Sequence, residues 1–599
     1  MRKIYLDTET TGLNPRVDKV QLIQLNENNK VTLLKTSEYP EAMQQLVEIC
    51  ENPEIMIIGH NLTFDLSFVR VYANRRVKFT NIYDTMLAEQ VILAGWGIPY
   101  LDKKTEELKT KRPEFSLKAL CSRHLGIDLD KSLQASDWGN AELTEAQMEY
   151  ASRDVEVLPA LQEIQENLLN ADGLRHIAQL EFDTIPAIVE MQVTGMPFSW
   201  DEAEKLRVIK KQETAKAVDD LEKEVRSKQA THQVTLFGDV VGVDVNFNSP
   251  VQIKKYLKDK LGLDVDSSDV ETLKGIDHPF AAKLLKYRGL EKQLQFFDQF
   301  EEYGAKSGRL YPFINQCRAA TGRMSSSRPN QQQVPKRGEG KVFRNLFKCK
   351  PGYKMVKVDY SAIEMRVTAA VSKDPAMLEA INTGVDLHKL TASKTSRKPM
   401  EEITKEDRQK AKAVNFGLCF GMSAPTLKKY SWFNYQVKMT DEEALETRDA
   451  YFNLYKGVAK WHENEKSKMR YPREVHLHTA ERGYYTQYLV EQRTILGRRR
   501  AWPNFMGESL ARMTEMCNTR VQGSAADLTK LALIQLYNEL PEEARLIGVI
   551  HDEILVECST EIAEDIKNLM LKCMCEPGNK MCDPVKIEAE GGVGDAWGS

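Results

Sequence analysis

Two apolar, β-rich segments, which lie almost two hundred residues apart, each deliver an aspartate. Asp359 ends the first expected strand, and Asp552 lies on a second one expected from Leu546 to Glu557. Brought together, two such carboxylates can hold a pair of divalent cations. Two metals about 3.5–4 Å apart are a common device for in-line displacement at phosphorus. The sequence therefore predicts a site for phosphoryl transfer.

A second set of carboxylates lies near the N-terminus. Asp7 and Glu9 follow the first expected strand, Asp65 follows an apolar strand at residues 55–58, and Tyr150 and Asp154 share one helix face. Four carboxylates from three elements can cage two Mg²⁺ ions, which prefer oxygen ligands. Such metals would activate a water and stabilise a departing 3′ oxygen, and Tyr150 would orient that water. Alone, Asp7 and Glu9 could equally be a surface strand end, and Tyr150 and Asp154 would more often be structural, but the order of the motifs favours a site.

A third pattern combines charge with aromatic rings. Arg408, Lys412, Phe416 and Phe420 recur every four residues, so they are expected on one broad helix face. Arg offers forked bonds to phosphate and Lys a mobile point charge, while the rings suit a sugar and a base. In isolation, the same spacing also fits an amphipathic helix with buried phenylalanines.

Length and composition suggest several domains. The chain has 599 residues, a net charge of −4 and ten scattered cysteines without recognised zinc spacing. We expect free thiols in a reducing compartment, no secretion signal and no membrane span. A basic surface for nucleic acid would have to be local, with candidates in residues 336–350 and at Arg498 to Arg500.

The pattern of elements changes along the chain. Residues 1–175 alternate β-rich and helical segments, which indicates an α/β domain. Residues 180–305 are mostly helical, with helices expected at 202–228 and 250–261, a helix start at Ser249-Pro250, and a loop or hairpin around 229–245. From residue 310 onward, a mixed domain contains a helical insertion at about 386–480.

Together these motifs resemble those of family A DNA polymerases of the bacterial polymerase I type. The order DxE, NxxxFD, YxxxD over residues 1–175 resembles the DEDD 3′–5′ exonucleases, tyrosine subtype. The resemblance implies an RNase H-like α/β exonuclease followed by a right-hand polymerase with an α+β palm and helical thumb and fingers. The exonuclease strand begins near residue 3, so no 5′ nuclease domain is expected. The expected divisions are exonuclease 1–178, thumb and connecting helices 179–309, palm 310–385, fingers 386–500 and palm 501–599.

The resemblance assigns roles at the polymerase site. Asp359 and Asp552 would ligate both metals, with the carbonyl of Tyr360 as a further ligand, and Glu553 would be a nearby catalytic carboxylate. Glu364 matches a steric gate against a ribose 2′-OH. His551 would touch the primer end.

The resemblance also assigns roles in nucleotide binding. Arg408 and Lys412 would grip the triphosphate, Lys412 would protonate pyrophosphate, and His388 is a third phosphate contact. Phe416 would sense the sugar 3′ position. Phe420 replaces the family's usual tyrosine, so the stacking ring is kept and the hydroxyl is lost.

Duplex-binding segments of the family also have counterparts. Six residues match positions that contact DNA, namely Arg323, Asn330, Gln332, Arg337, Asn518 and Gln522. Donors such as Arg and Gln can test base-pair shape in the minor groove, where acceptors occur in every base pair. Thr514 replaces a common arginine, and Arg512 could supply that template contact.

The expected function is template-directed addition of dNTPs to a primer 3′-OH, with 3′–5′ proofreading, in replication or repair. Each active site would hold two Mg²⁺, for which Mn²⁺ can substitute. The partners would be primer–template DNA and dNTPs, and the chain would be a monomer. The protein would act in the cytoplasm or nucleoid of a cell, in a phage-infected host cell or in an organelle. Two alternatives stay open: a single-subunit RNA polymerase, and a DNA-binding nuclease with a degenerate polymerase half.

Overall fold

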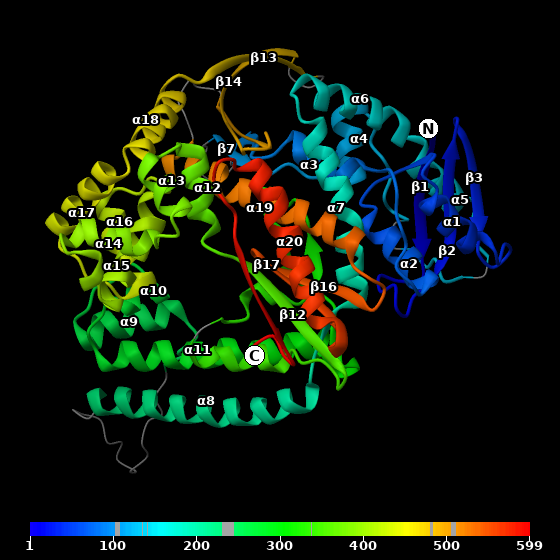
Figure 1. Cartoon of the computed structure of the whole chain (residues 1–599). Coiled ribbons are helices and arrows are strands. Elements are labelled where there is room, and N and C mark those ends of the chain that lie inside the picture. Colours follow the sequence, from blue (N-terminus) through cyan, green and yellow to red (C-terminus); the bar gives the residue numbers. More distant parts are fainter. Residues whose placement is uncertain are drawn as a thin grey trace, which may run out of the picture.

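The computed structural model describes residues 1–101, 108–133, 136–140, 142–229, 245–336, 338–479, 483–504 and 511–599. Figure 1 shows the N-terminal elements at the right, two long helices along the bottom, a helical group at the left and a second sheet between them. Among the described residues, no helix combines the length and apolar character needed to cross a membrane. All ten cysteines are free, as expected.

The N-terminal domain is built on a five-stranded mixed sheet. Its strand order is β3-β2-β1-β4-β5, in which β1 pairs antiparallel with β2 and parallel with β4. The strands are β1 (Arg2–Thr10), β2 (Val20–Glu27), β3 (Lys30–Lys35), β4 (Ile55–Gly59) and β5 (Ile82–Asp84). The expected α/β domain is thus confirmed.

Helices α1 (Ala42–Glu51), α2 (Thr63–Ala73), α3 (Thr85–Ile92), α4 (Leu117–Leu125), α5 (Glu145–Glu156) and α6 (Leu158–Ala171) complete this domain, with a hairpin of β6 (Ile98–Leu101) and β7 (Leu108–Lys111). Helix α5 packs against β1, β2 and β3. A capping box between Thr144 and Gln147 fixes where α5 begins. Because α5 begins at a fixed residue and packs against β1, Tyr150 and Asp154, which are four residues apart, lie on the same side of the helix.

Helix α7 (Arg175–Thr194) contributes to two hydrophobic cores. Its side chains Ile177, Ala178, Phe182, Ile185 and Val189 join the core of the N-terminal domain. On the same helix, Ala187, Ile188 and Met191 join the core around the second sheet. The expected division after residue 178 falls inside this helix.

A helical arm follows, consisting of α8 (Trp200–Gln229), α9 (Pro250–Leu261), α10 (Val270–Lys274) and α11 (Pro279–Glu302). The Ser249 side chain accepts a hydrogen bond from the Gln252 amide, and Pro250 occupies the first turn, which confirms the predicted helix start. Leu221, Tyr256 and Phe280 pack in the core of the arm. The loop or hairpin expected at 229–245 lies mostly outside the described residues.

The second sheet is antiparallel and has the order β16-β17-β12-β18. Its strands are β12 (Tyr353–Tyr360), β16 (Ala544–Ile550), β17 (Glu553–Ser559) and β18 (Ala589–Gly594), and the long helices beside it are α12 (Ile363–Ser372), α19 (Met513–Glu539) and α20 (Ala563–Met581).

The single strand expected from Leu546 to Glu557 is wrong. The chain reverses at His551 and Asp552, between β16 and β17, and His551 adopts a left-handed φ of 61°. Nearly every residue of both strands is buried. The prediction joined two buried apolar strands into one, because only the two residues His551 and Asp552 separate them and neither strand shows the alternation that would reveal its own bounds.

The remaining elements form a helical group and a three-stranded sheet. The helices are α13 (Pro375–Asn382), α14 (Leu387–Ser396), α15 (Lys405–Leu418), α16 (Ala424–Tyr435), α17 (Asp441–Leu454) and α18 (Lys456–Arg470); the strands are β13 (Arg473–Thr479), β14 (Gly483–Arg493) and β15 (Arg499–Asn504). In Figure 1, β13 and β14 run from α18 across the top of the molecule. Short two-stranded pairs, β8 (Met196–Pro197) with β9 (Arg309–Leu310) and β10 (Phe313–Asn315) with β11 (Ser325–Ser327), connect the parts.

Candidate active sites

The first site gathers four carboxylates at one end of the second sheet, from Asp359, Asp552, Glu553 and Glu364. Asp359 lies near the end of β12, directly opposite Glu553 of β17. Asp552 lies in the turn just before β17. Burial, followed by the charges of Asp359 and Glu364, raises the pKa of Asp552 to about 7. The two expected metal ligands and the expected gate residue are therefore close enough to repel one another.

The donor set at this site fits a hard divalent cation. Oδ2 of Asp359 accepts a hydrogen bond from Nζ of Lys336 at 2.7 Å. Oδ1 of the same carboxylate is buried and has no hydrogen-bond partner among the described residues. A buried oxygen without a partner, beside a second crowded carboxylate, is suited to the all-oxygen coordination that Mg²⁺ and Mn²⁺ prefer.

The side chains of Tyr360 and Glu553 form hydrogen bonds with groups outside the carboxylate cluster. The Tyr360 hydroxyl donates to the backbone oxygen of Met574 at 3.0 Å, so only the Tyr360 main chain could face a metal. Oε2 of Glu553 accepts from Nη1 of Arg344 at 3.2 Å and from Nε1 of Trp597 at 3.0 Å. Glu553 thus anchors Arg344 in this structure, and its expected catalytic role stays a prediction.

Glu364 and His551 border the same carboxylates. Glu364 lies in the first turn of α12, and its Oε1 accepts from Nη2 of Arg323 at 3.3 Å. Burial, with help from the positive charges of Arg323 and Arg344, lowers the pKa of His551. A neutral imidazole is therefore expected in the turn at neutral pH.

The nucleotide-binding pattern lies mainly on α15. Nε of Arg408 donates to Oδ2 of Asp386 at 2.8 Å, and Nζ of Lys412 lies 5.9 Å from the ring centre of Phe416. The helix begins at a capping box between Thr404 and Asp407. Arg408, Lys412 and Phe416 therefore share a helix face, as predicted.

The placement of Phe420 on that face is wrong. Helix α15 ends at Leu418, and Phe420 lies in the following turn, where it joins the core around the second sheet. Gly421 has a φ of +76° and its amide donates to the Leu418 carbonyl, so the chain leaves the helix before Phe420. The four-residue spacing alone could not reveal this stop.

His388 is buried beside the same helix. Its ring centre lies 5.8 Å from that of Phe416, and Nδ2 of Asn415 lies 2.8 Å from its Nδ1. Burial lowers the pKa of His388 to about 4. Because Nδ1 accepts the amide N–H, the proton of the neutral ring belongs on Nε2, which could donate to a phosphate.

The expected DNA contacts are spread over two segments. The Asn330 side chain caps the short helix Gln331–Gln333, and Nε2 of Gln332 donates to the Met324 carbonyl. Asn518 and Gln522 lie one turn apart on α19, where Oδ1 of Asn518 is buried without a partner among the described residues. Arg337 lies outside the described residues.

The second site is a carboxylate cluster in the N-terminal domain. Carboxylate oxygens of Asp7, Glu9 and Asp154 all lie within 4.8 Å of one another. Burial, with the charge of Asp154, raises the pKa of Glu9 to about 8, and burial also raises the pKa of Asp65 to about 7. Because the negative charges of these carboxylates repel one another, divalent cations between them would be stabilising, as at the first site.

Asp65 completes the cluster through the β1 strand. Its Oδ1 accepts from the Thr8 hydroxyl at 2.6 Å, and its charge contributes to the raised pKa of Asp7 after burial itself. Thr8 lies between Asp7 and Glu9 on β1, so one strand aligns three of the four carboxylates.

Sequence reasoning missed Lys131 and Lys336 as site residues. Nζ of Lys131 donates to the Tyr150 hydroxyl at 3.0 Å and to Oδ2 of Asp154 at 2.6 Å. No local spacing marks Lys131, because it reaches Tyr150 and Asp154 only in the folded molecule. Lys336 was noted only as part of a basic run, because its contact with Asp359 depends on tertiary packing.

Comparison with known proteins identifies the class. The model of DNA polymerase family A matches residues 215–599, and a 3′–5′ exonuclease model matches residues 1–170. DNA polymerase I of Aquifex aeolicus is 31% identical over 99% of this chain and 95% of its own length. That of Pseudomonas aeruginosa is 27% identical over 99% of this chain and 63% of its own length. DNA polymerase I of Mycobacterium tuberculosis is 34% identical over 60% of this chain and 39% of its own length.

A solved structure supports the fold. The polymerase domain of Pol1 from M. smegmatis, in a complex with DNA primer–template and dNTP, matches with a TM-score of 0.78 and 24% identity, over 99% of this chain and 95% of that one. The chain belongs to DNA polymerase family A, with a 3′–5′ exonuclease domain in the same polypeptide. The expected fold class is confirmed.

Proposed function

We propose that this chain extends the 3′ end of a DNA primer along a template and removes terminal nucleotides that do not pair. The observation that carries this proposal is the convergence of Asp359, Asp552 and Glu364, beside a helix that presents Arg408 and Lys412. The second carboxylate cluster provides a separate hydrolytic site.

In the synthetic reaction, Asp359, Asp552 and the carbonyl of Tyr360 would hold two Mg²⁺ ions, with Mn²⁺ as a substitute. The ions would supply activation of the primer 3′-OH and neutralisation of the pyrophosphate. Arg408 would orient the triphosphate through its forked donors, once its contact with Asp386 is exchanged for phosphate.

Three further residues would serve selection and proton transfer. Lys412 would deliver a proton to the departing pyrophosphate. Glu364 would exclude nucleotides that carry a 2′-OH, because the Arg323 contact keeps its carboxylate in place. His551 would contact the primer end. The helices around α15 would close on a matched base pair, which couples correct pairing to catalysis.

In the exonuclease reaction, Asp7, Glu9, Asp65 and Asp154 would hold two Mg²⁺ ions, which supply the nucleophilic hydroxide. Tyr150 would orient the attacking water. Lys131 would hold the Tyr150 hydroxyl and offset part of the charge on Asp154.

Apart from the boundary at residue 178, which falls inside α7, the proposed organisation follows the divisions expected from the sequence, with the arm at α8 to α11 as thumb and the helices α14 to α18 as fingers. The chain would act as a monomer on primer–template DNA, in the cytoplasm or nucleoid. Arg323, Asn330, Gln332, Asn518 and Gln522 would contact the duplex.

A labelled primer–template incubated with Mg²⁺, with and without dNTPs, tests the proposal. Lengthening with dNTPs and shortening without them is the expected result. Preference for rNTPs would instead indicate an RNA polymerase. Shortening under both conditions would indicate a nuclease whose polymerase half is inactive.

A further inference from the structure

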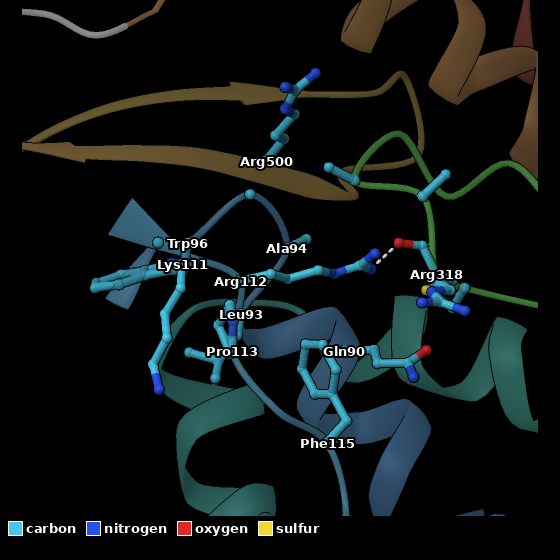
Figure 2. A pocket seen from close by; sticks show the side chains of 15 residues that line it. Gln90, Leu93, Ala94, Trp96, Lys111, Arg112, Pro113, Phe115, Arg318 and Arg500 are labelled. Carbon is cyan, nitrogen blue, oxygen red and sulfur yellow. Dashed lines mark hydrogen bonds between the residues drawn. The ribbon is translucent and has the colours of Figure 1, made fainter. Parts of the chain in front are cut away.

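A pocket of about 360 Å³ lies where the exonuclease domain meets the polymerase half. One wall comes from the exonuclease segments 93–97 and 111–113 with Phe115, and the other from residues 317–320 and Arg500 of β15. Figure 2 shows Arg112 reaching across this space toward Arg318. Apart from Arg500, which belongs to one of the expected basic segments, no residue that lines this pocket has a role in either active site.

The walls of the pocket are fixed by backbone contacts. The Ala501 amide of β15 donates to the Ala94 carbonyl at 2.9 Å, and Nη2 of Arg499 donates to the Ile92 carbonyl at 2.7 Å. Gly95, with a φ of +82°, comes so close to β15 that a Cβ would lie 2.5 Å from the Ala501 oxygen. These contacts fix the position of the exonuclease segment relative to β15, so the pocket between them has a defined shape.

The lining of the pocket is cationic. Lys111, Arg112 and Arg318 contribute positive charge, and none of the described residues that line it is acidic. Arg112 donates to the backbone oxygen of Arg318. Burial, and then the charge of Arg318, lower the pKa of Arg112. Two guanidinium groups held this close are stabilised by an anion between them.

Arg500 plays a different part in the pocket. Its guanidinium bonds Oε1 of Glu515 at 3.1 Å and lies 4.6 Å from the Trp502 ring centre. Figure 2 shows this side chain directed away from Arg112 and Arg318. Figure 2 also shows Lys111 directed away from the space between Arg112 and Arg318, so the charge available to a ligand there comes from these two arginines.

Aromatic side chains accompany these cations. Phe115 and Trp96 line the pocket, and the Arg112 guanidinium carbon lies 5.8 Å from the Phe115 ring centre. Nε1 of Trp96 is buried and has no acceptor among the described residues. Cations combined with rings are typical of sites that bind single-stranded nucleic acid through its phosphates and base faces.

The location connects the pocket to both active sites. On the polymerase side, residues 317–320 lead directly to Arg323, which contacts Glu364. On the exonuclease side, the Phe115 backbone contacts His60, whose ring bonds Thr85 at 2.9 Å. His60 directly precedes the segment that carries Asp65.

We propose that this pocket binds the unpaired 3′ segment of the primer strand while it is held between the polymerase and exonuclease sites. The inference rests on the proposed function, because it requires one primer to use both sites. Arg112 and Arg318 would contact a backbone phosphate, and Phe115 or Trp96 would contact a base. The pocket would set how readily a frayed primer reaches the exonuclease.

Arg318→Glu tests the proposal, since this side chain is exposed and its reversal should not disturb the core. Three reactions are compared: dNTP addition to a matched primer, hydrolysis of a dinucleotide, and hydrolysis of a primer with a mismatched 3′ segment. We expect the last to fall by about tenfold or more, the size of one lost charged contact, and the others to be unchanged. Arg112→Gln should act in the same direction.

A binding measurement provides an independent readout. In an Asp7→Ala background, which prevents cleavage, a labelled oligothymidylate should bind more weakly after Arg318→Glu. The slope of log Kd against log salt should decrease by about 0.7 for each lost phosphate contact. Arg75→Glu is the matched control, because Arg75 is an exposed arginine of the same domain that does not line the pocket.

Several results would overturn the inference. Equal losses in all three reactions for both charge variants would indicate a folding role. Unchanged mismatch removal and unchanged oligothymidylate binding would remove the pocket from the primer path. If Arg318→Glu weakens the binding of a deoxynucleoside monophosphate but not that of oligothymidylate, the pocket would be a site for the product of hydrolysis. If the unaltered chain shows neither lengthening nor shortening of primers, the proposed function itself fails.

Discussion

Nζ of Lys336 lies 2.7 Å from Oδ2 of Asp359, which is one of the two expected metal ligands of the polymerase site. A metal that uses Oδ2 must share this oxygen with the ammonium or displace it, and a metal at the unpartnered Oδ1 still competes with the ammonium for the charge of the same carboxylate. Lys336→Ala should lower the Mg²⁺ concentration for half-maximal dNTP addition by about two- to fivefold, the scale of one exposed ion pair. Lys354→Ala, whose partner is Asp595, is the control and should leave that concentration unchanged. A higher Mg²⁺ requirement in Lys336→Ala would contradict this competition.

The two carboxylate clusters should be separable by substitution. Asp359→Ala should abolish dNTP addition and retain hydrolysis of single-stranded DNA, because Asp359 belongs only to the polymerase site at the end of the second sheet. Asp7→Ala should do the reverse. Both activities are measured on one labelled primer with Mg²⁺, and circular dichroism verifies folding. A folded variant that loses both activities would refute the division into two sites.

Stability of the metal-free protein should fall as the pH rises. Burial, followed by neighbouring carboxylates, raises the pKa of Asp552 to about 7 and that of Glu9 to about 8. The unfolded chain releases these protons near pH 4, so the folded state binds more protons between about pH 4 and pH 8. The stabilisation is complete below that range and is lost as the pH rises through it.

Thermal unfolding at several pH values measures this effect. Mg²⁺ should raise Tm more at about pH 8 than at about pH 5, because the carboxylates are then ionised and need a counter-charge. Asp552→Asn should reduce the pH dependence. An equal Mg²⁺ effect at both pH values would show that the carboxylates are ionised throughout.

Selection against ribonucleotides should depend on Glu364. Its carboxylate is fixed by Arg323 at 3.3 Å beside Asp552. Glu364→Ala should raise rNTP incorporation relative to dNTP by roughly tenfold or more, because space for a 2′-OH opens in the site. Competitive incorporation of dATP and ATP opposite one template base measures this ratio. Loss of both reactions to the same extent would indicate a role in catalysis instead.

A buried charge network should dominate stability near the polymerase site. Glu181 pairs with Lys530 and Arg498, and Lys530 donates to the Gly322 carbonyl at 2.8 Å. Glu181→Ala would leave two buried cations without this carboxylate, which should cost about 3–5 kcal/mol of unfolding free energy. Glu27→Ala, in the exposed pair with Arg2, should cost under about 1 kcal/mol. Urea unfolding compares the two, and equal costs would contradict the inference.

The carboxylates could be predicted because chemistry and local periodicity coincide. Asp7 and Asp359 follow short apolar runs, within β1 and near the end of β12, and Tyr150 and Asp154 follow a helical spacing, so each pattern is readable over a few residues. The match to family A motifs then supplied their pairing across the chain.

The remaining features depend on packing that no local pattern contains. The β16–β17 turn consists of only two residues between two buried apolar strands, and Phe420 leaves its helix because Gly421 turns the chain. Lys336 and Lys131 reach their carboxylates only in the folded molecule. Surface lysines occur throughout the chain, so their type alone does not single them out.

Helix α7 has a practical consequence for anyone who wishes to separate the two activities. Its opposite faces supply side chains to the exonuclease core and to the polymerase core, including Phe182 on one and Met191 on the other. Cutting the chain at residue 178 would divide this helix and leave apolar surface on both fragments, a cause of aggregation. A proofreading-deficient version is therefore better obtained by changing Asp7 than by truncation.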